Sequence, residues 1–115
     1  MKLDWTSARA AQQEFAAAAQ QAYGHQLAPP PNATAFNRSL AQAEHALLLP
    51  DGLPHRPWYR HSIYAPGELT GYEAVEIPGV NDAIETADAA RAQAQLEALA
   101  AALDRAAAAL NAPAQ

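Results

Sequence analysis

The chain has 115 residues, a formal net charge of −5 and no cysteine. This length suits a single domain with one hydrophobic core, and the lack of cysteine excludes disulfides and thiolate metal sites. Only seven residues are Lys or Arg, so the chain lacks the concentrated cationic surface that a nucleic-acid binder needs. No apolar run approaches the ~20 residues of a membrane span, and the first residues turn polar too early for a signal peptide, so we expect neither.

Alanine is concentrated in two regions, 8–22 and 83–112. Alanine is the best helix former, so both regions are predicted to be helical. A GC-rich bacterial genome would also enrich alanine and favour arginine over lysine. Either origin of the bias leaves the helix prediction unchanged.

The first helix is predicted at about 4–23, with Gly24 ending it as a left-handed cap. Its few bulky apolar residues are Trp5, Phe15 and Tyr23, and alanines fill the face between them. Small residues on that face would let a neighbouring helix approach closely.

A second helix is predicted at about 34–49, after a stiff run of three prolines. Asn32 or Thr34 can cap its free amides, and Pro50 stops it. Apolar residues follow at steps of four, three and four, the spacing of one buried helical stripe. These residues are Phe36, Leu40, Ala43 and Leu47.

Residues 50–78 differ from the rest of the chain, because alanine nearly vanishes and five of the nine prolines lie here. A non-helical stretch of this length is uncommon in a compact domain and is usually functional or disordered. Its aromatic content argues against disorder. We therefore predict an ordered, extended loop that packs on the helices.

A short helix is predicted at about 80–86, and Asp88 can cap a longer one at 88–111. The longer helix carries a heptad-like apolar seam at Leu96, Leu99, Leu103, Ala106 and Leu110. This seam is interpreted as intramolecular core. The predicted fold is all-α: one domain over 1–115, an antiparallel bundle of three long helices and one short helix, with the loop crossing one end.

Several sequence blocks in and beside the predicted loop resemble those of a known family. They are Gly52-Leu53-Pro54, Arg56-Pro57-Trp58-Tyr59-Arg60-His61, Ile63-Tyr64-Ala65-Pro66, Tyr72 and Ile77-Pro78-Gly79, followed by Asp82. In order and spacing they resemble the transferrin-receptor-like dimerisation domain, the C-terminal helical domain of glutamate carboxypeptidases and transferrin receptors. The flanking helices fit this resemblance in length and position.

The resemblance implies a role inside a larger protein. In that family a di-zinc peptidase domain and a protease-associated insert precede the helical domain, which forms much of the homodimer contact and closes one side of the substrate cleft. The implied partners are therefore a second copy and the peptidase domain of the parent chain. Transferrin receptors keep this domain without peptidase activity, so the parent is either a zinc-dependent carboxypeptidase or aminopeptidase, or an inactive relative.

The resemblance also implies one substrate-contacting residue in the full-length parent, Tyr72. Glutamate carboxypeptidases bring a Lys-Tyr pair to the carboxylate end of the substrate, and Tyr72 occupies the tyrosine position. Gly71 stands where the lysine would be. An acidic C-terminal residue is therefore a less expected substrate feature for this protein.

No catalytic residue, metal site or cofactor is predicted within the chain itself. His55 and His61 are the best metal candidates, but they lack a third ligand at a productive spacing, and a catalytic zinc normally needs three protein ligands. No Ser-His-acid set and no Gly-rich phosphate loop is present.

The remaining charged and aromatic residues of the loop are interpreted as structural. Three could bind an anion or a C-terminal carboxylate, but we favour hydrogen bonds that hold the loop's backbone; these are Arg56, Arg60 and His61. Three aromatic residues are predicted to fasten the loop, with Trp58 and Tyr64 buried against the helices; these are Trp58, Tyr59 and Tyr64.

A rival hypothesis is a free-standing helical adaptor whose aromatic loop binds a peptide or protein. An encoded zinc-peptidase domain upstream would favour the dimerisation domain over this rival. The compartment is left open, with an exported parent, periplasmic or extracellular, as one alternative.

Overall fold

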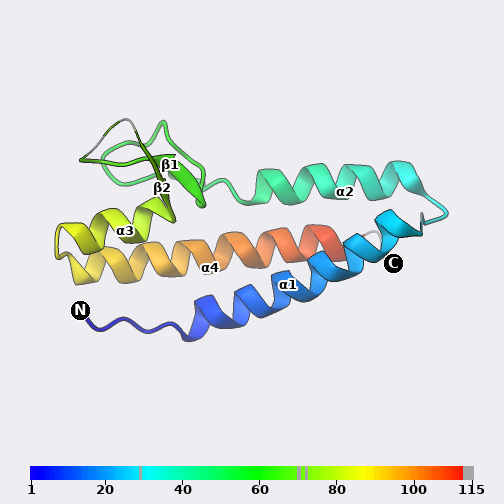
Figure 1. Ribbon diagram of the computed structural model, residues 1–115, viewed down its shortest axis with the longest axis horizontal. Coiled ribbons are helices and arrows are strands. Elements are labelled where there is room, and N and C mark those ends of the chain that lie inside the picture. Colours follow the sequence, from blue (N-terminus) through cyan, green and yellow to red (C-terminus); the bar gives the residue numbers. More distant parts are fainter. Residues whose placement is uncertain (29, 70, 72, 113–115) are drawn as a thin grey trace.

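A computed structural model describes residues 1–28, 30–69, 71 and 73–112. Within this part the chain forms mostly helix, which confirms the all-α prediction, together with two short strands (Figure 1). The elements are α1 (Thr6–Leu27), α2 (Ala33–Ala46), β1 (Tyr64–Pro66), β2 (Ala74–Glu76), α3 (Pro78–Glu85) and α4 (Ala89–Asn111).

Helix α4 forms the centre of the bundle, and α1, α2 and α3 each pack against it. In Figure 1, α2 and α3 run antiparallel to α4, as predicted for the bundle. Helix α1 runs in the same general direction as α4, because the chain returns through α2 and the long loop before α4 begins.

Alanines make the contact between α1 and α4. The buried residues of α1 are all alanine, namely Ala8, Ala11, Ala18 and Ala22. Small side chains let the two helix backbones approach closely, so the contact is long but buries few large side chains. Near α3, the larger side chains of Val80 and Leu96 join Ala8, Ala11 and Ala100 in one buried cluster.

Two of the helices begin at a side-chain cap that the sequence predicts. The Asn32 side chain accepts a hydrogen bond from Ala35 N, and the Asp88 side chain accepts one from Arg91 N, so both predicted caps are present. The prediction that Gly24 ends α1 is wrong, because the helix continues to Leu27.

The first helix ends at the proline run instead. Ala28, which directly precedes a proline in the sequence, adopts extended backbone with φ −130° and ψ 90°. The residue before a proline is disfavoured in helical conformation, and this restriction ends α1 more effectively than Gly24 does. Helix α2 ends at Ala46, three residues earlier than predicted, and the chain then turns into the loop.

The connection from 47 to 77, called the long loop below, is more regular than the predicted extended loop. Strands β1 and β2 pair antiparallel, with Ala65 opposite Val75. A second small core lies beneath the loop and consists of Leu49, Leu53 and Ala65, with Ala98 of α4 packed against it. In the described part of the chain, none of the helices combines the length and the apolar character that a membrane crossing needs.

Candidate functional site

The first half of the long loop folds into a tight turn around Gly52. Gly52 has φ +73°, and a Cβ placed there would lie 2.2 Å from the carbonyl oxygen of Pro57. Hydrogen bonds from Leu53 N to Tyr59 O (2.8 Å) and from Tyr59 N to Arg56 O (2.9 Å) close the turn. Only glycine fits this backbone, so the Gly-Leu-Pro block of the sequence has a steric reason.

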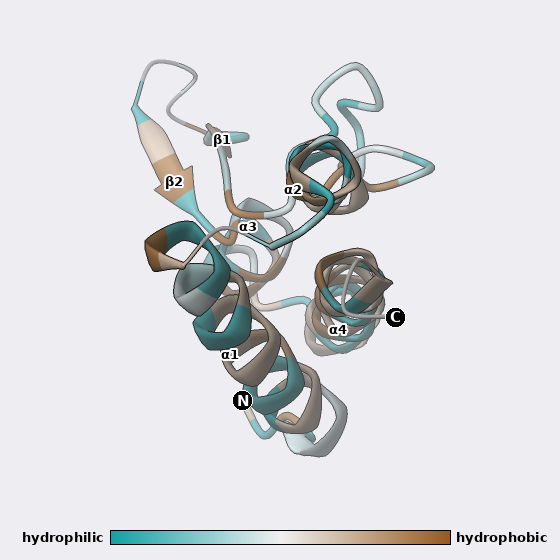
Figure 2. Ribbon diagram, turned by 90° about the vertical axis from the view of Figure 1, so that its right-hand side faces the viewer, coloured by the Kyte–Doolittle hydropathy of each residue, from teal (hydrophilic) through white to brown (hydrophobic). Residues whose placement is uncertain are grey.

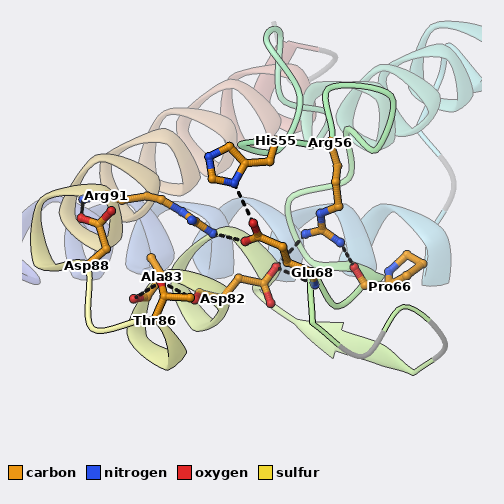
Figure 3. Close-up of polar contacts among 9 residues, drawn as sticks. All are labelled: His55, Arg56, Pro66, Glu68, Asp82, Ala83, Thr86, Asp88 and Arg91. Carbon is orange, nitrogen blue, oxygen red and sulfur yellow. Dashed lines mark hydrogen bonds and ion pairs between the residues drawn. The ribbon is translucent and has the colours of Figure 1, made fainter.

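A buried ion pair fastens this turn to α3. Arg56 donates from Nη2 to Asp82 Oδ2 at 2.6 Å, and the two side chains are only 11% and 2% exposed. Arg56 Nη1 also donates to the carbonyl oxygen of Pro66 in β1 (Figure 3). One guanidinium group therefore joins the turn, the hairpin and α3, and the acidic residue that follows Pro-Gly in the sequence is its partner.

Glu68 joins the loop to α4 in a second ionic contact (Figure 3). Its carboxylate lies 2.6 Å from His55 Nδ1 and 2.5 Å from Arg91 Nη2. The hydrogen bond with His55, and then that with Arg91, lowers the pKa of Glu68 below its ordinary value. Glu68 is therefore held as a carboxylate between the loop and the first turn of α4.

Three further polar residues of the loop bind its own backbone. Arg60 donates from Nε to Leu49 O at 3.0 Å, and Ser62 donates from Oγ to Leu47 O at 2.6 Å. His61 Nδ1 accepts a hydrogen bond from Ile63 N at 3.1 Å. These contacts occupy Arg60 and His61 with the backbone, in the manner expected of residues that hold a loop in place.

The aromatic residues do not lie where the sequence predicts. Trp58 is 70% exposed and Tyr64 is 56% exposed, so the prediction that both are buried against the helices is wrong. Leu53, which is 2% exposed, fills the space beneath the loop, and the ion pair of Arg56 holds the turn without an aromatic wedge. Tyr59 is partly covered, because the Arg56 guanidinium lies 5.6 Å from its ring centroid.

Tyr72, the predicted substrate contact, lies outside the residues that the structure describes. Its neighbour Gly71 has φ +72°, and nothing lies within 4 Å of a Cβ built there. Among the described residues, no three His, Cys, Asp or Glu side chains gather as metal ligands would. His55 and His61 make separate contacts, with Glu68 and with the loop backbone.

Sequence reasoning missed Glu68 and Arg91. The two residues are 23 positions apart and belong to no repeating pattern. Arg91 is recognisable only as the residue three positions after the cap Asp88, and Glu68 only as an acidic residue between two turn glycines. The site is thus a polar framework that fixes the loop, with the side chains of Trp58 and Tyr64 exposed to solvent.

The chain matches the family model described as "Transferrin receptor-like dimerisation domain" over residues 3–111. It is 44% identical over 62 residues to a probable glutamate carboxypeptidase of Arabidopsis thaliana, covering 54% of this chain. It is 36% identical over 76 residues, 66% of this chain, to an inactive zinc metalloprotease of Schizosaccharomyces pombe. A probable glutamate carboxypeptidase of Arthroderma benhamiae is 44% identical over 46 residues, 40% of this chain.

The matched regions are small parts of these relatives. The chain spans 9% of the length of the plant and fission-yeast proteins and 6% of the Arthroderma protein. The three relatives come from a plant and from fungi, so they lend no support to the bacterial origin that the alanine content suggested.

Proposed function

This chain belongs to the transferrin receptor-like dimerisation domain family, and we propose that it joins two copies of a longer, peptidase-like protein and supports one side of that protein's substrate cleft. The observation that carries the proposal is the match over residues 3–111, which includes all four helices and the long loop. The relatives add a carboxypeptidase-like or metalloprotease-like context.

The framework of the long loop supports the cleft role. A surface that closes a cleft must keep its shape while substrate enters and leaves, and pre-organised groups bind with a smaller ordering cost. The Arg56–Asp82 pair and the Glu68 contacts hold the turn, the hairpin, α3 and α4 together. We assign Tyr72 as the residue that contacts substrate in the full-length protein, with Gly71 leaving out a second, cationic contact.

This assignment is tested in the full-length protein that carries the domain. Tyr72→Phe should raise KM for a peptide substrate several-fold and change kcat little, because it removes one hydroxyl contact. Tyr64→Phe is the matched control, since Tyr64 lies in β1 of the same hairpin. Equal KM values for the parent protein and Tyr72→Phe would contradict the assignment.

The domain itself is proposed to be non-catalytic. His55 is engaged with Glu68 and His61 with a backbone amide, and the catalytic zinc sites of proteins normally use three protein ligands. The purified 115-residue chain should show no aminopeptidase or carboxypeptidase turnover with added zinc. Zinc-dependent hydrolysis that co-purifies with the chain and is lost in His55→Ala would overturn this proposal.

Homodimer formation is tested by sedimentation equilibrium of the chain from micromolar to millimolar concentration. A stable specific interface usually buries ~1,200–2,000 Å² in total, and a module of this size supplies part of that area. We expect a reversible monomer–dimer equilibrium with weak association. A chain that remains strictly monomeric at millimolar concentration would remove the support for homodimerisation.

One observation favours a second candidate, the free-standing adaptor. Trp58 and Tyr64 are exposed, and exposed aromatic residues often serve as contacts for another protein. The same side chains would equally suit a contact with a peptidase domain of the parent. The upstream coding sequence distinguishes the two candidates, because a zinc-peptidase domain encoded there would favour the dimerisation domain over the adaptor.

A further inference from the structure

Helix α1 carries a second apolar stripe that its contact with α4 leaves uncovered. Trp5, Tyr23 and Leu27 are 43%, 59% and 71% exposed, although with Phe15 they are the bulkiest apolar side chains of this segment. Figure 2 shows α4 on one side of α1 and no helix on its other side. At 3.6 residues per turn, these three residues lie on one face, roughly a third of a turn from the buried alanines.

The positions on this face form a symmetric pattern. They are 5, 9, 12, 16, 20, 23 and 27, all of them exposed, and we call them the outer stripe. The successive steps are four, three, four, four, three and four, which read the same in both directions from Ala16. A two-fold interface needs this property, because every residue that contacts another is contacted in return.

The side chains of the outer stripe are complementary when the stripe is paired antiparallel with itself. Ala16 then meets Ala16 of a second copy, which allows close approach of the two helices. Trp5 meets Leu27, an apolar pair, and the cationic Arg9 meets the ring of Tyr23, a favourable cation–π arrangement.

The two remaining positions of the outer stripe fit as well. Gln12 meets Gln20, and two amide side chains can donate to and accept from each other. Arg9 is the stripe's single charged residue, so no like charges oppose each other in this register. A parallel pairing would instead place Arg9 against Arg9.

A groove beside Trp5 gives the second copy a place to bury an apolar side chain. It has a volume of about 340 Å³. Trp5, Arg9 and Gln12 form its α1 side. The remaining lining is apolar and consists of Ala8, also in α1, with Ile63, Ile77, Leu96, Leu99 and Leu103. In the antiparallel register, Leu27 of the second copy reaches this end of α1, and symmetry repeats the contact at the other end.

We infer that the outer stripe of α1 is the surface on which a second copy of this chain packs, antiparallel, with Ala16 at the two-fold axis. This inference rests on the proposed homodimerisation and assigns it to one helix face. The 22 residues of α1 span about 33 Å, so a helix pair with two filled grooves makes a modest interface. Such an interface agrees with weak association of the isolated chain.

The test compares two charge insertions on α1 by sedimentation equilibrium of the 115-residue chain. Ala16→Glu places two carboxylates against each other at the axis and should weaken the dimer at least about tenfold. Ala10→Glu is the control, because Ala10 is exposed but lies about 120° around the helix axis from Ala16, outside the outer stripe. Glutamate is a good helix former, so both variants should keep the helical circular-dichroism spectrum of the parent chain.

A crosslinking experiment examines the axis directly, since the chain has no cysteine of its own. A symmetric disulfide requires Cα atoms about 4.4–6.8 Å apart, so Ala16→Cys should form a covalent dimer on mild oxidation and Ala10→Cys should not. Equal dimerisation constants for Ala16→Glu and the parent chain would overturn the inference while homodimerisation stands. Equal crosslinking yields for Ala10→Cys and Ala16→Cys would do the same. If the parent chain is monomeric throughout, both are overturned.

Discussion

The contact between α1 and α4 and the long loop are stabilised in opposite ways. The helix contact consists of many alanines, each adding a small apolar area, and no single residue dominates it. The loop depends on a few residues with several partners each, above all Arg56 and Glu68. In the helix contact, the loss of unfolding free energy on substitution should therefore follow the change in side-chain volume. In the loop, that loss should depend on which single residue is changed.

The buried ion pair offers the largest test of this comparison. Asp82→Ala leaves the Arg56 guanidinium buried without its carboxylate, and breaking a buried pair from one side costs about 3–5 kcal/mol. Urea denaturation should show this loss of unfolding free energy. Asp104→Ala, an exposed position of α4, should change it by less than about 0.5 kcal/mol. Equal effects of the two variants would contradict the dependence of the loop on one pair.

Gly52→Ala examines the steric requirement of the turn. Left-handed backbone costs a non-glycine residue roughly 1–2 kcal/mol, and the contact with Pro57 O adds to this, so we expect a loss of more than about 2 kcal/mol. Gly71→Ala has nearly the same φ but open space around its Cβ, so it should show the backbone cost alone. Equal losses of thermal stability in the two variants would show that the turn can move away from Pro57.

In the helix contact the corresponding change is an enlarged side chain. Ala100 is 3% exposed and packs with Ala8 and Ala11 of α1, so Ala100→Leu should cost about 1–3 kcal/mol through overpacking. Ala108→Leu, exposed on the same helix, should be nearly neutral when both variants are measured by thermal denaturation. A tolerated leucine at position 100 would mean that α1 and α4 are less closely packed than described.

The smallest expected effect concerns Trp58. Because its side chain is 70% exposed, Trp58→Ala should lower the unfolding free energy by less than about 0.5 kcal/mol. Leu53 lies in the same turn and is 2% exposed, so Leu53→Ala should lower the unfolding free energy by about 2–5 kcal/mol. A large loss at Trp58, measured by chemical denaturation, would place the indole in the core after all.

The same contrast explains what could be predicted from the sequence. The helices were found because propensity, caps such as Asn32 and Asp88, and apolar spacing act over short distances along the chain. The prediction for the end of α1 is wrong because Gly24 can adopt helical backbone, whereas the proline that follows Ala28 disfavours it in the preceding residue.

The framework of the loop was not predictable in the same way. Contacts such as Arg91 with Glu68 join residues that only the folded chain brings together. The position of Trp58 among prolines in an alanine-rich chain predicts its burial, yet Leu53 fills the space under the loop. The resemblance to the family rests on residues of this loop, but the direction of each side chain required the structure.

The alanine core also has a calorimetric consequence. Ordering an alanine fixes as much backbone as ordering a leucine, while its methyl group removes much less apolar surface from water. The heat capacity change of unfolding follows that surface, so for this domain it should fall below the ~12–15 cal/mol/K per residue of ordinary globular proteins. A smaller heat capacity change flattens the curve of stability against temperature. The isolated domain should therefore show a broad, shallow stability maximum and a wide thermal transition.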